Sequence, residues 1–306
     1  MEKYHKIKRI GDLENKDIFA DRNDIITVQE KMDGANMRIF ITQEGKLIFG
    51  SRNLEIDETV EDHEKRNSNF LRAINYIKEK VKDKDLTEYA GLTLYGENMV
   101  KHTMQYDWDN IPPFLGFDIK DREGKYMHPA PVEDIYTELG LEMVPHIEMM
   151  KAGYITIFDE DTVPVSKYAP KSNPKQQAEG VVYKNYDKQI FAKYVRDAFK
   201  EANSATFGGS PKYNKQGDTD NSEFIFKYCT NARIEKLIFK AVDEGADLDM
   251  KLMGRLIKET YLDIIEEEWR EILTSNWKLD FKNIRRSIAP RVRAVLGQVM
   301  VNTNLK

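Results

Sequence analysis

Residues 25–36 have the sequence IITVQEKMDGAN, in which an apolar run leads directly into Lys31, followed by Asp33 and Gly34. A lysine has a pKa of roughly 10.4, so a lysine that acts as a nucleophile must be desolvated or lie beside other cations. The end of a strand that opens into a phosphate pocket provides both conditions. Gly34 lacks a side chain that would block a ligand, and Asn36 carries an amide that can donate and accept hydrogen bonds. The same residues also suit a hairpin turn with Asp-Gly at its tip, and this segment alone leaves both interpretations open.

Further segments with polar residues at the ends of apolar runs follow in a fixed order along the chain. A fixed order of such segments arises by chance less often than a similar amino-acid composition. The segments are Ser51-Arg52-Asn53, Tyr95-Gly96-Glu97, residues 114–119 (FLGFDI), residues 179–184 (EGVVYK) and residues 190–195 (IFAKYV).

Together with residues 30–36, these segments resemble motifs I, Ia, III, IIIa, IV and V of the covalent nucleotidyltransferases, the superfamily of ATP-dependent ligases and messenger RNA capping enzymes. The resemblance covers about residues 24–203. It is closest to the RNA ligase 2 type, because of Asn36 five residues after the lysine and the stretch from Lys193 to Glu201. The resemblance implies an α+β fold with a nucleotidyltransferase (ATP-grasp-like) domain of antiparallel sheets and peripheral helices.

The resemblance also implies roles for individual residues. Lys31 would be the nucleophile that accepts AMP, with Glu179 and Lys193 as further catalytic residues. Glu97 would hold the ribose, and Glu97 and Glu179 would bind Mg²⁺ or Mn²⁺, since oxygen ligands are those that Mg²⁺ prefers. The side chains implied in ATP binding are Glu30, Asp33, Asn36, Arg52, Glu97, Phe117, Val181 and Lys184.

Several of these roles have a structural alternative. Asp33 could orient the lysine amine, or it could accept hydrogen bonds from backbone N–H groups in a turn. Arg52 could form bidentate hydrogen bonds with a phosphate, or it could be a surface arginine. Phe117 could stack on adenine, or it could pack in an apolar core.

The last motif departs from the family pattern Lys-x-Lys. Lys193 matches the second lysine, which contacts the reacting α-phosphate in the family, but Phe191 occupies the position of the first. Lys184, five residues after Glu179, could supply the missing cation. We therefore treat the assignment of this motif as a hypothesis.

The apolar patterns predict which segments form strands and which form helices. Period-2 alternation and turn residues predict two strands within residues 24–52, joined at 42–46, and further strands at 91–97, 114–119, 178–184 and 190–195. Apolar residues at helical spacing predict peripheral helices at 58–82 and 132–139.

A linker is predicted at residues 207–221, because Phe207 to Asp218 is rich in loop-forming residues and lacks an apolar period. It would separate a nucleotidyltransferase domain, 1–206, from a C-terminal domain, 222–306. The C-terminal domain has helical spacing at 225–242, 250–272 and 281–301. DNA ligases and capping enzymes continue into an oligonucleotide-binding β-barrel, whereas the RNA ligase 2 type has a small all-helical domain here.

A basic stretch lies near the end of the helical domain. Because clustered lysines and arginines are the electrostatic footprint of nucleic-acid binding, we predict RNA-binding side chains in this stretch. The alternative is a solvated helix face that pairs with Glu266-Glu267-Glu268. The predicted RNA-binding residues are Arg285, Arg286, Arg291 and Arg293.

The composition is that of an intracellular enzyme. The 306 residues favour one large and one smaller domain, and 41% hydrophobic residues suffice for their cores. The single cysteine, Cys229, rules out an intrachain disulfide, and neither a signal-peptide core nor an apolar run of about 20 residues is present. The five histidines lack ligand spacing, so we assign no structural metal site. A net charge of −5 argues against a non-specific nucleic-acid coat.

These observations favour an ATP-dependent RNA ligase that joins 3′-hydroxyl and 5′-phosphate RNA ends through a lysyl-AMP intermediate, with ATP and Mg²⁺ (or Mn²⁺), in RNA repair. We expect a monomer in the cytoplasm, or in a host's cytoplasm if the source is a phage or virus, with no membrane partner. The alternatives are a DNA ligase, a GTP-dependent capping guanylyltransferase, or a catalytically silent nucleic-acid-binding module.

Overall fold

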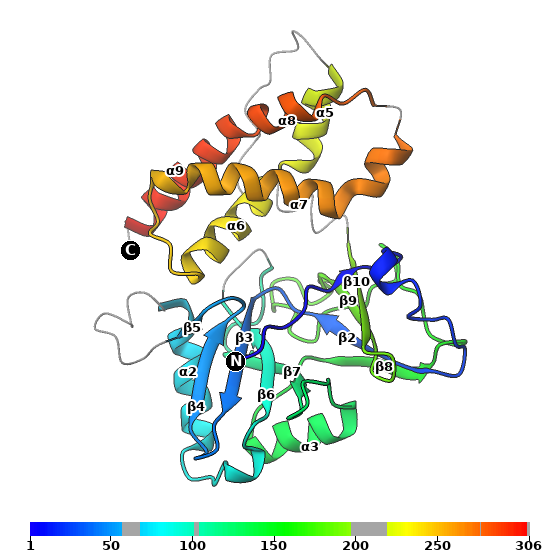
Figure 1. Cartoon of the computed structure of the whole chain (residues 1–306), viewed down its shortest axis with the longest axis vertical. Helices are drawn as coiled ribbons and strands as arrows, with labels where there is room; N and C mark the ends of the chain where they lie inside the picture. The colour runs from blue at the N-terminus through cyan, green and yellow to red at the C-terminus, as the bar shows by residue number, and fades with distance from the viewer. Residues whose placement is uncertain (57–67, 101–103, 197–218, 276, 305–306) are drawn as a thin grey trace. The chain divides into compact units, whose positions relative to one another are not determined.

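The computed structural model describes residues 1–56, 68–100, 104–196, 219–275 and 277–304 (Figure 1). The chain divides into two compact units, Met1–Arg196 and Asp197–Lys306. Most of the predicted linker, 207–218, lies outside the described residues, as does the first part of the helix predicted at 58–82. The predicted domain limits therefore stay predictions.

The described residues of the first unit form two five-stranded sheets, which we call sheets A and B. In sheet A every neighbouring pair is antiparallel except β1 and β10. Its strands are, in order, β1 (Lys8–Arg9), β10 (Ile190–Val195), β9 (Gly180–Asn185), β2 (Ile25–Lys31) and β8 (His146–Lys151). One face of sheet A buries an apolar cluster that contains Ile26, Val28, Val181 and Tyr183.

Sheet B is antiparallel throughout. Its hairpin between β3 and β4 closes where the Thr42 N–H donates to the Lys46 carbonyl at 2.9 Å, with Gly45 at a φ of 72° that favours glycine. This is the turn predicted at 42–46, but the prediction of two strands within 24–52 is wrong, because β2 ends at Lys31 in sheet A and the chain then enters sheet B as a separate strand, β3. The strands are, in order, β5 (Glu55–Ile56), β4 (Leu47–Ser51), β3 (Ala35–Ile41), β6 (Thr93–Asn98) and β7 (Phe114–Lys120).

Two helices, α2 (Ser68–Val81) and α3 (Pro129–Leu139), cover one face of sheet B (Figure 1). The helical spacing of the α2 apolar residues puts Phe70, Ile74 and Ile77 into a core with Met37 and Ile39 of the sheet. Short 3₁₀ helices lie at Leu13–Asn15 (η1) and Thr87–Tyr89 (η2).

The second unit is helical in all its described secondary structure. Its elements are α5 (Thr219–Tyr228), α6 (Asn231–Asp243), η3 (Met250–Leu252), α7 (Met253–Thr274), α8 (Phe281–Ser287) and α9 (Ala289–Asn304). Apolar residues from these helices form one core, including Phe224, Ile238, Leu256 and Leu296. The predicted fold class is thus confirmed: α+β with antiparallel-rich sheets, followed by a helical region.

Two predicted helices of this unit are each split in two. The helix predicted at 225–242 is interrupted at Thr230, whose hydroxyl accepts from the Arg233 N–H and so begins α6. The helix predicted at 281–301 is interrupted near Ile288, because Pro290 has no N–H and cannot continue a helix that began before it. Within the described residues, no helix is long and apolar enough to span a membrane.

Candidate active site

The candidate site lies around Lys31, the last residue of β2. Its Nζ donates to Oε2 of Glu179 at 2.7 Å, and the two side chains are 20% and 4% exposed. Burial by itself lowers the pKa of Lys31, but the carboxylates of Glu179, Glu97 and Asp33 act the other way and raise the pKa above its ordinary value. The structure therefore holds this amine as an ammonium ion among carboxylates.

Glu97 comes to this cluster from sheet B. Its Oε1 accepts from the Gly34 N–H at 3.1 Å, which links the end of β2 to β6. Burial raises the pKa of Glu97 to about 7; Lys31 opposes this, and Glu179 adds to it. A Cβ on Gly34 would lie 2.5 Å from the Asn98 carbonyl oxygen, so the close approach of the two segments requires a glycine there.

Asp33 is part of the same cluster, and it also anchors a distant loop. Its Oδ2 accepts from the Met104 N–H at 2.8 Å, and its own N–H donates to Oη of Tyr106 at 2.8 Å. Asp33 therefore does accept a hydrogen bond from a backbone N–H, as the structural alternative proposed. The donor, however, is Met104, which lies in a loop about seventy residues away (|i−j| = 71) and not in the turn itself. The Asp33 charge still acts on Lys31.

Lys193 lies on the same face of sheet A as Lys31. In antiparallel strands, opposed residues share a face, and so do alternate residues along each strand. Lys31 opposes Gly180, and two residues further along β9 Val182 opposes Lys193. The strand register thus places the side chains of Lys31 and Lys193 on the same face of sheet A.

Glu30 and Val181 oppose each other on the other face of the sheet. Val181 is fully buried in the apolar cluster, and Glu30 accepts from the Lys167 N–H at 3.1 Å. The structure therefore does not bring these two predicted nucleotide-binding side chains to Lys31.

Asn36 and Arg52 occupy sheet B. Asn36 opposes Glu97 across β3 and β6, and its buried Oδ1 has no hydrogen-bond partner within the described residues. Arg52, directly after β4, is half-buried. Its segment is held by Arg38, which was not predicted and whose guanidinium donates to the carbonyls of Ser51 at 2.6 Å and Leu54 at 3.1 Å.

Lys184 is committed to a buried ion pair. Its Nζ lies 2.7 Å from Oδ2 of Asp118, and the two side chains are 2% and 0% exposed. Burial lowers the pKa of Lys184, and Asp118 only partly offsets this effect. Asp118 also accepts from the hydroxyls of Tyr4 and Tyr186, each at 2.6 Å. No local pattern in the chain predicts this cluster, because Asp118 is far in the sequence from each of these partners.

The Lys184 ammonium also contacts two aromatic rings. It lies 5.2 Å from the ring centroid of Phe117 and 5.6 Å from that of Phe191. Phe191 packs in a buried aromatic cluster with Tyr4, Tyr95, Tyr126 and Tyr186, while Phe117 is partly buried against it. Phe191, which departs from the family's Lys-x-Lys pattern, thus belongs to an aromatic core.

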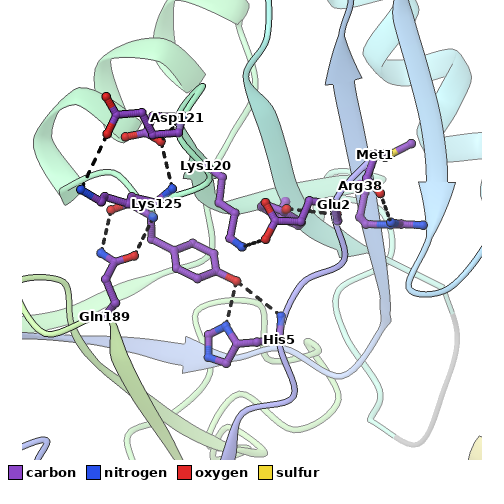
Figure 2. A network of polar contacts seen from close by, with 11 residues as sticks. Met1, Glu2, His5, Arg38, Lys120, Asp121, Lys125 and Gln189 are labelled. Carbon is purple, nitrogen blue, oxygen red and sulfur yellow. Dashed lines mark hydrogen bonds and ion pairs between the residues drawn. The ribbon is translucent and has the colours of Figure 1, made fainter.

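The N-terminal segment makes polar contacts with residues of β3 and β7 and of the loop after β7 (Figure 2). Glu2 pairs with Lys120, and Nδ1 of His5 lies 2.8 Å from the Tyr126 hydroxyl. The Met1 carbonyl accepts from Arg38 at 3.2 Å. Sequence reasoning assigned no role to these residues, because a terminal segment without an apolar period carries no packing signal.

A family model described as RNA ligase matches residues 24–200, more than half of the chain. The chain belongs to the RNA ligase family. A comparison with curated protein sequences found no significant match.

Solved structures of an RNA ligase are similar to this chain. The chain is similar to a Naegleria gruberi RNA ligase with PPi (19% identity, TM-score 0.49), to a variant of that ligase with AMP and Mn (19%, 0.50) and to a variant with ATP and Mn (19%, 0.49). Each match covers 66% of this chain. The present chain spans 57% of the length of the Naegleria gruberi RNA ligase solved with PPi. At 19% identity, the similarity concerns the fold alone.

The predicted metal ligands Glu97 and Glu179 both raise the pKa of Lys31. Within the described residues, no group of three or more His, Cys, Asp or Glu side chains has the arrangement of a metal site. Two carboxylates and the partnerless Asn36 oxygen are nevertheless the hard oxygen donors that suit Mg²⁺ or Mn²⁺. The metal assignment stays a prediction.

The four arginines predicted to bind RNA differ in how far they are exposed. Arg285 and Arg286 are exposed on α8, and Arg293 is exposed on α9. Arg291 is half-buried and donates from Nε to Oδ1 of Asn231 at 3.1 Å.

The alternative pairing with Glu266-Glu267-Glu268 is not seen for the two arginines of α8. Glu268 is buried and pairs with Arg233 at 2.7 Å. Neither Arg285 nor Arg286 forms an ion pair with any described residue.

Proposed function

We propose that this chain is an ATP-dependent RNA ligase that seals a 3′-hydroxyl to a 5′-phosphate through a covalent lysyl-AMP intermediate. The observation that carries the proposal is the placement of the half-buried Lys31 at a strand end, with its Nζ 2.7 Å from Glu179 and within the electrostatic influence of Glu97, in a chain of the RNA ligase family. A lysine in this position is the type of nucleophile that accepts a nucleotidyl group.

Lys31 must lose a proton before it can attack, because an ammonium nitrogen has no lone pair. The carboxylates that raise its pKa oppose this loss. A divalent cation held by Glu97 and Glu179 would supply positive charge that lowers the pKa of the amine and offsets charge on phosphate oxygens. In the first transfer the Lys31 nitrogen bonds to the α-phosphorus of ATP, the bond to the bridging oxygen breaks, and pyrophosphate leaves.

Lys193 supports this transfer from the same face of sheet A. Its ammonium would offset the charge on the α-phosphate as the in-line displacement proceeds, and positioning and charge neutralisation carry most of such a reaction. The RNA 5′-phosphate then takes AMP from Lys31, and the 3′-hydroxyl displaces AMP in the last transfer.

Lys184 would act differently from Lys193. Its buried pair with Asp118 and its contact with the Phe117 ring favour a role in positioning the aromatic wall of the nucleotide pocket. On this proposal the adenine would lie against Phe117, with Arg52 and Asn36 as polar contacts from sheet B.

The choice of ATP and of a divalent cation draws support from the Naegleria gruberi RNA ligase, which has been solved with ATP, with AMP and with Mn. A DNA ligase and a GTP-dependent capping enzyme would use the same lysine chemistry. A silent binding module would have no need of the Lys31–Glu179 pair. The helical unit, through its exposed basic side chains, would provide the surface that neutralises RNA phosphates.

The test is incubation of the chain with labelled ATP or labelled GTP and Mg²⁺, followed by denaturing electrophoresis. We expect covalent label from ATP, none from GTP and none after chelation of the metal. Nicked duplexes with RNA or DNA strands then distinguish the polymer. Label from GTP would indicate a capping enzyme, and no label from either nucleotide would refute the proposal.

A further inference from the structure

The helical unit contains a cavity of about 660 Å³ between α7, α8 and the start of α9, which we call the α7–α8 pocket. Its volume is in the range of small-molecule sites. Apolar and aromatic side chains come from both helices α7 and α8, and all its charged lining is positive. The residues that define it are Ile257, Tyr261, Phe281, Lys282, Arg285 and Arg286.

The cations of the α7–α8 pocket share one side of α8. Positions 282, 285 and 286 are three and four residues apart, which brings their side chains to one helix face. Within the described part of the chain, none of these side chains forms an ion pair. Three uncompensated positive charges around one cavity fit a ligand that carries more than one negative charge.

The rings of the pocket supply a different kind of contact. Tyr261 follows Ile257 by one turn of α7, and Phe281 is 42% exposed at the start of α8. An exposed aromatic ring is a stacking platform for a planar ring. The pocket therefore has the features that suit a ligand with both phosphates and an accessible planar ring.

We propose that the α7–α8 pocket binds an unpaired nucleotide of the RNA substrate, with its base against Tyr261 and Phe281 and the adjoining phosphates on Lys282, Arg285 and Arg286. This inference rests on the proposed function and specifies which form of RNA the helical unit prefers. Bases inside an A-form duplex are stacked and hide their ring faces, so a duplex would engage only the cations. An unpaired nucleotide engages both the cations and the rings.

The direct test measures binding of a fluorescent oligouridylate to the full-length chain by anisotropy across a range of salt concentrations. Tyr261→Leu and Phe281→Leu keep apolar bulk but remove the ring, and each should weaken binding about five- to a hundredfold, the loss expected for one stacked base. Arg285→Gln should weaken binding and reduce the slope of log affinity against log salt by about one.

Matched controls come from the same unit. Phe226→Leu removes an exposed ring that does not line the pocket, and Lys236→Gln removes an exposed charge from α6. Both controls should bind like the wild type. If Tyr261→Leu and Phe281→Leu also bind like the wild type, or if the controls lose as much affinity as they do, the pocket assignment is wrong.

A second measurement locates the base. An oligonucleotide with 5-iodouridine, irradiated in complex with the chain, should cross-link to Tyr261 or Phe281, and a cross-link confined to other residues would overturn the proposal. Free AMP should not displace the oligonucleotide, since displacement would identify a site for free nucleotides. Covalent labelling of Lys31 by ATP is assayed separately, so a chain that binds the oligonucleotide without becoming adenylated contradicts the proposed function but not the pocket.

Discussion

Glu97→Gln should stabilise the protein at neutral and alkaline pH and have little effect at acidic pH. Burial raises the pKa of Glu97 from 4.5 to about 7, against the opposing charge of Lys31. A glutamine side chain cannot ionise, but its amide oxygen can still accept from the Gly34 N–H, so the substitution removes the charge and keeps the hydrogen bond.

The sign follows from proton binding. Below about pH 4.5 the carboxyl is protonated in both the folded and the unfolded chain, so it contributes no difference. Above about pH 7 the folded protein must hold a charge that the unfolded chain holds in water, and the full cost is present. The pKa difference of about 2.5 corresponds to at most about 3 kcal/mol, and we expect about 2 kcal/mol because the side chain is only half-buried.

The assay is thermal unfolding of the wild type and Glu97→Gln, followed by circular dichroism between about pH 5 and about pH 8. For a unit of this size, about 2 kcal/mol corresponds to a gain of about 4–8 °C in Tm at the alkaline end. Glu123→Gln, at an exposed turn, is the control and should not change the Tm. A Tm difference that stays constant or shrinks as the pH rises would refute the reasoning.

Three further predictions concern the site and its sheet. Lys31→Ala and Lys31→Arg should both abolish covalent labelling by ATP, because a guanidinium stays protonated, and label retained on either variant would exclude the lysyl-AMP assignment. Glu179→Ala and Lys193→Ala should each reduce RNA sealing by at least about 100-fold in a gel assay, and wild-type sealing by both would move the phosphate contacts elsewhere. Gly180→Ala should destabilise the chain by about 3 kcal/mol in urea unfolding, because its Cβ would lie 2.0 Å from the Tyr194 carbonyl oxygen, and an unchanged midpoint would show that the strands separate at little cost.

Several strands and helices could be predicted from the sequence because they depend on local patterns, although β8 (His146–Lys151) was not predicted and residues 24–52 form three strands and not two. Alternation of apolar residues marked the strands that carry Lys31 and Lys193, and helical spacing marked α2 through Phe70, Ile74 and Ile77. The change from strand patterns to helical patterns after the predicted linker likewise indicated a helical second unit. Each of these signals lies within a short window of the chain.

Breaks within the helices were harder to predict, since an apolar period continues across them. Thr230 and Pro290 are the residues that could have indicated the two breaks. A threonine or a proline in a helical pattern, however, interrupts a helix only in some contexts. The structure shows that Thr230 caps α6 and that α9 begins immediately before Pro290.

For the candidate site too, the sequence predicted one part and the tertiary structure determined the rest. The sequence alone placed Lys31, Glu97 and Glu179 at the ends of apolar runs, because strand ends are where polar side chains follow buried ones. Only the tertiary structure decided which faces these strands present: the register between β2 and β9 gives Lys31 and Lys193 one surface and turns Glu30 and Val181 to the other.

The contacts of Asp118 with Lys184, Tyr4 and Tyr186 could likewise not be predicted from the sequence. Burying a charge is costly unless partners satisfy it, and here every partner comes from a segment more than sixty residues from Asp118 (|i−j| = 66, 68 and 114). A short window of sequence records which residues can carry a charge or a ring, whereas long-range packing determines which of them meet.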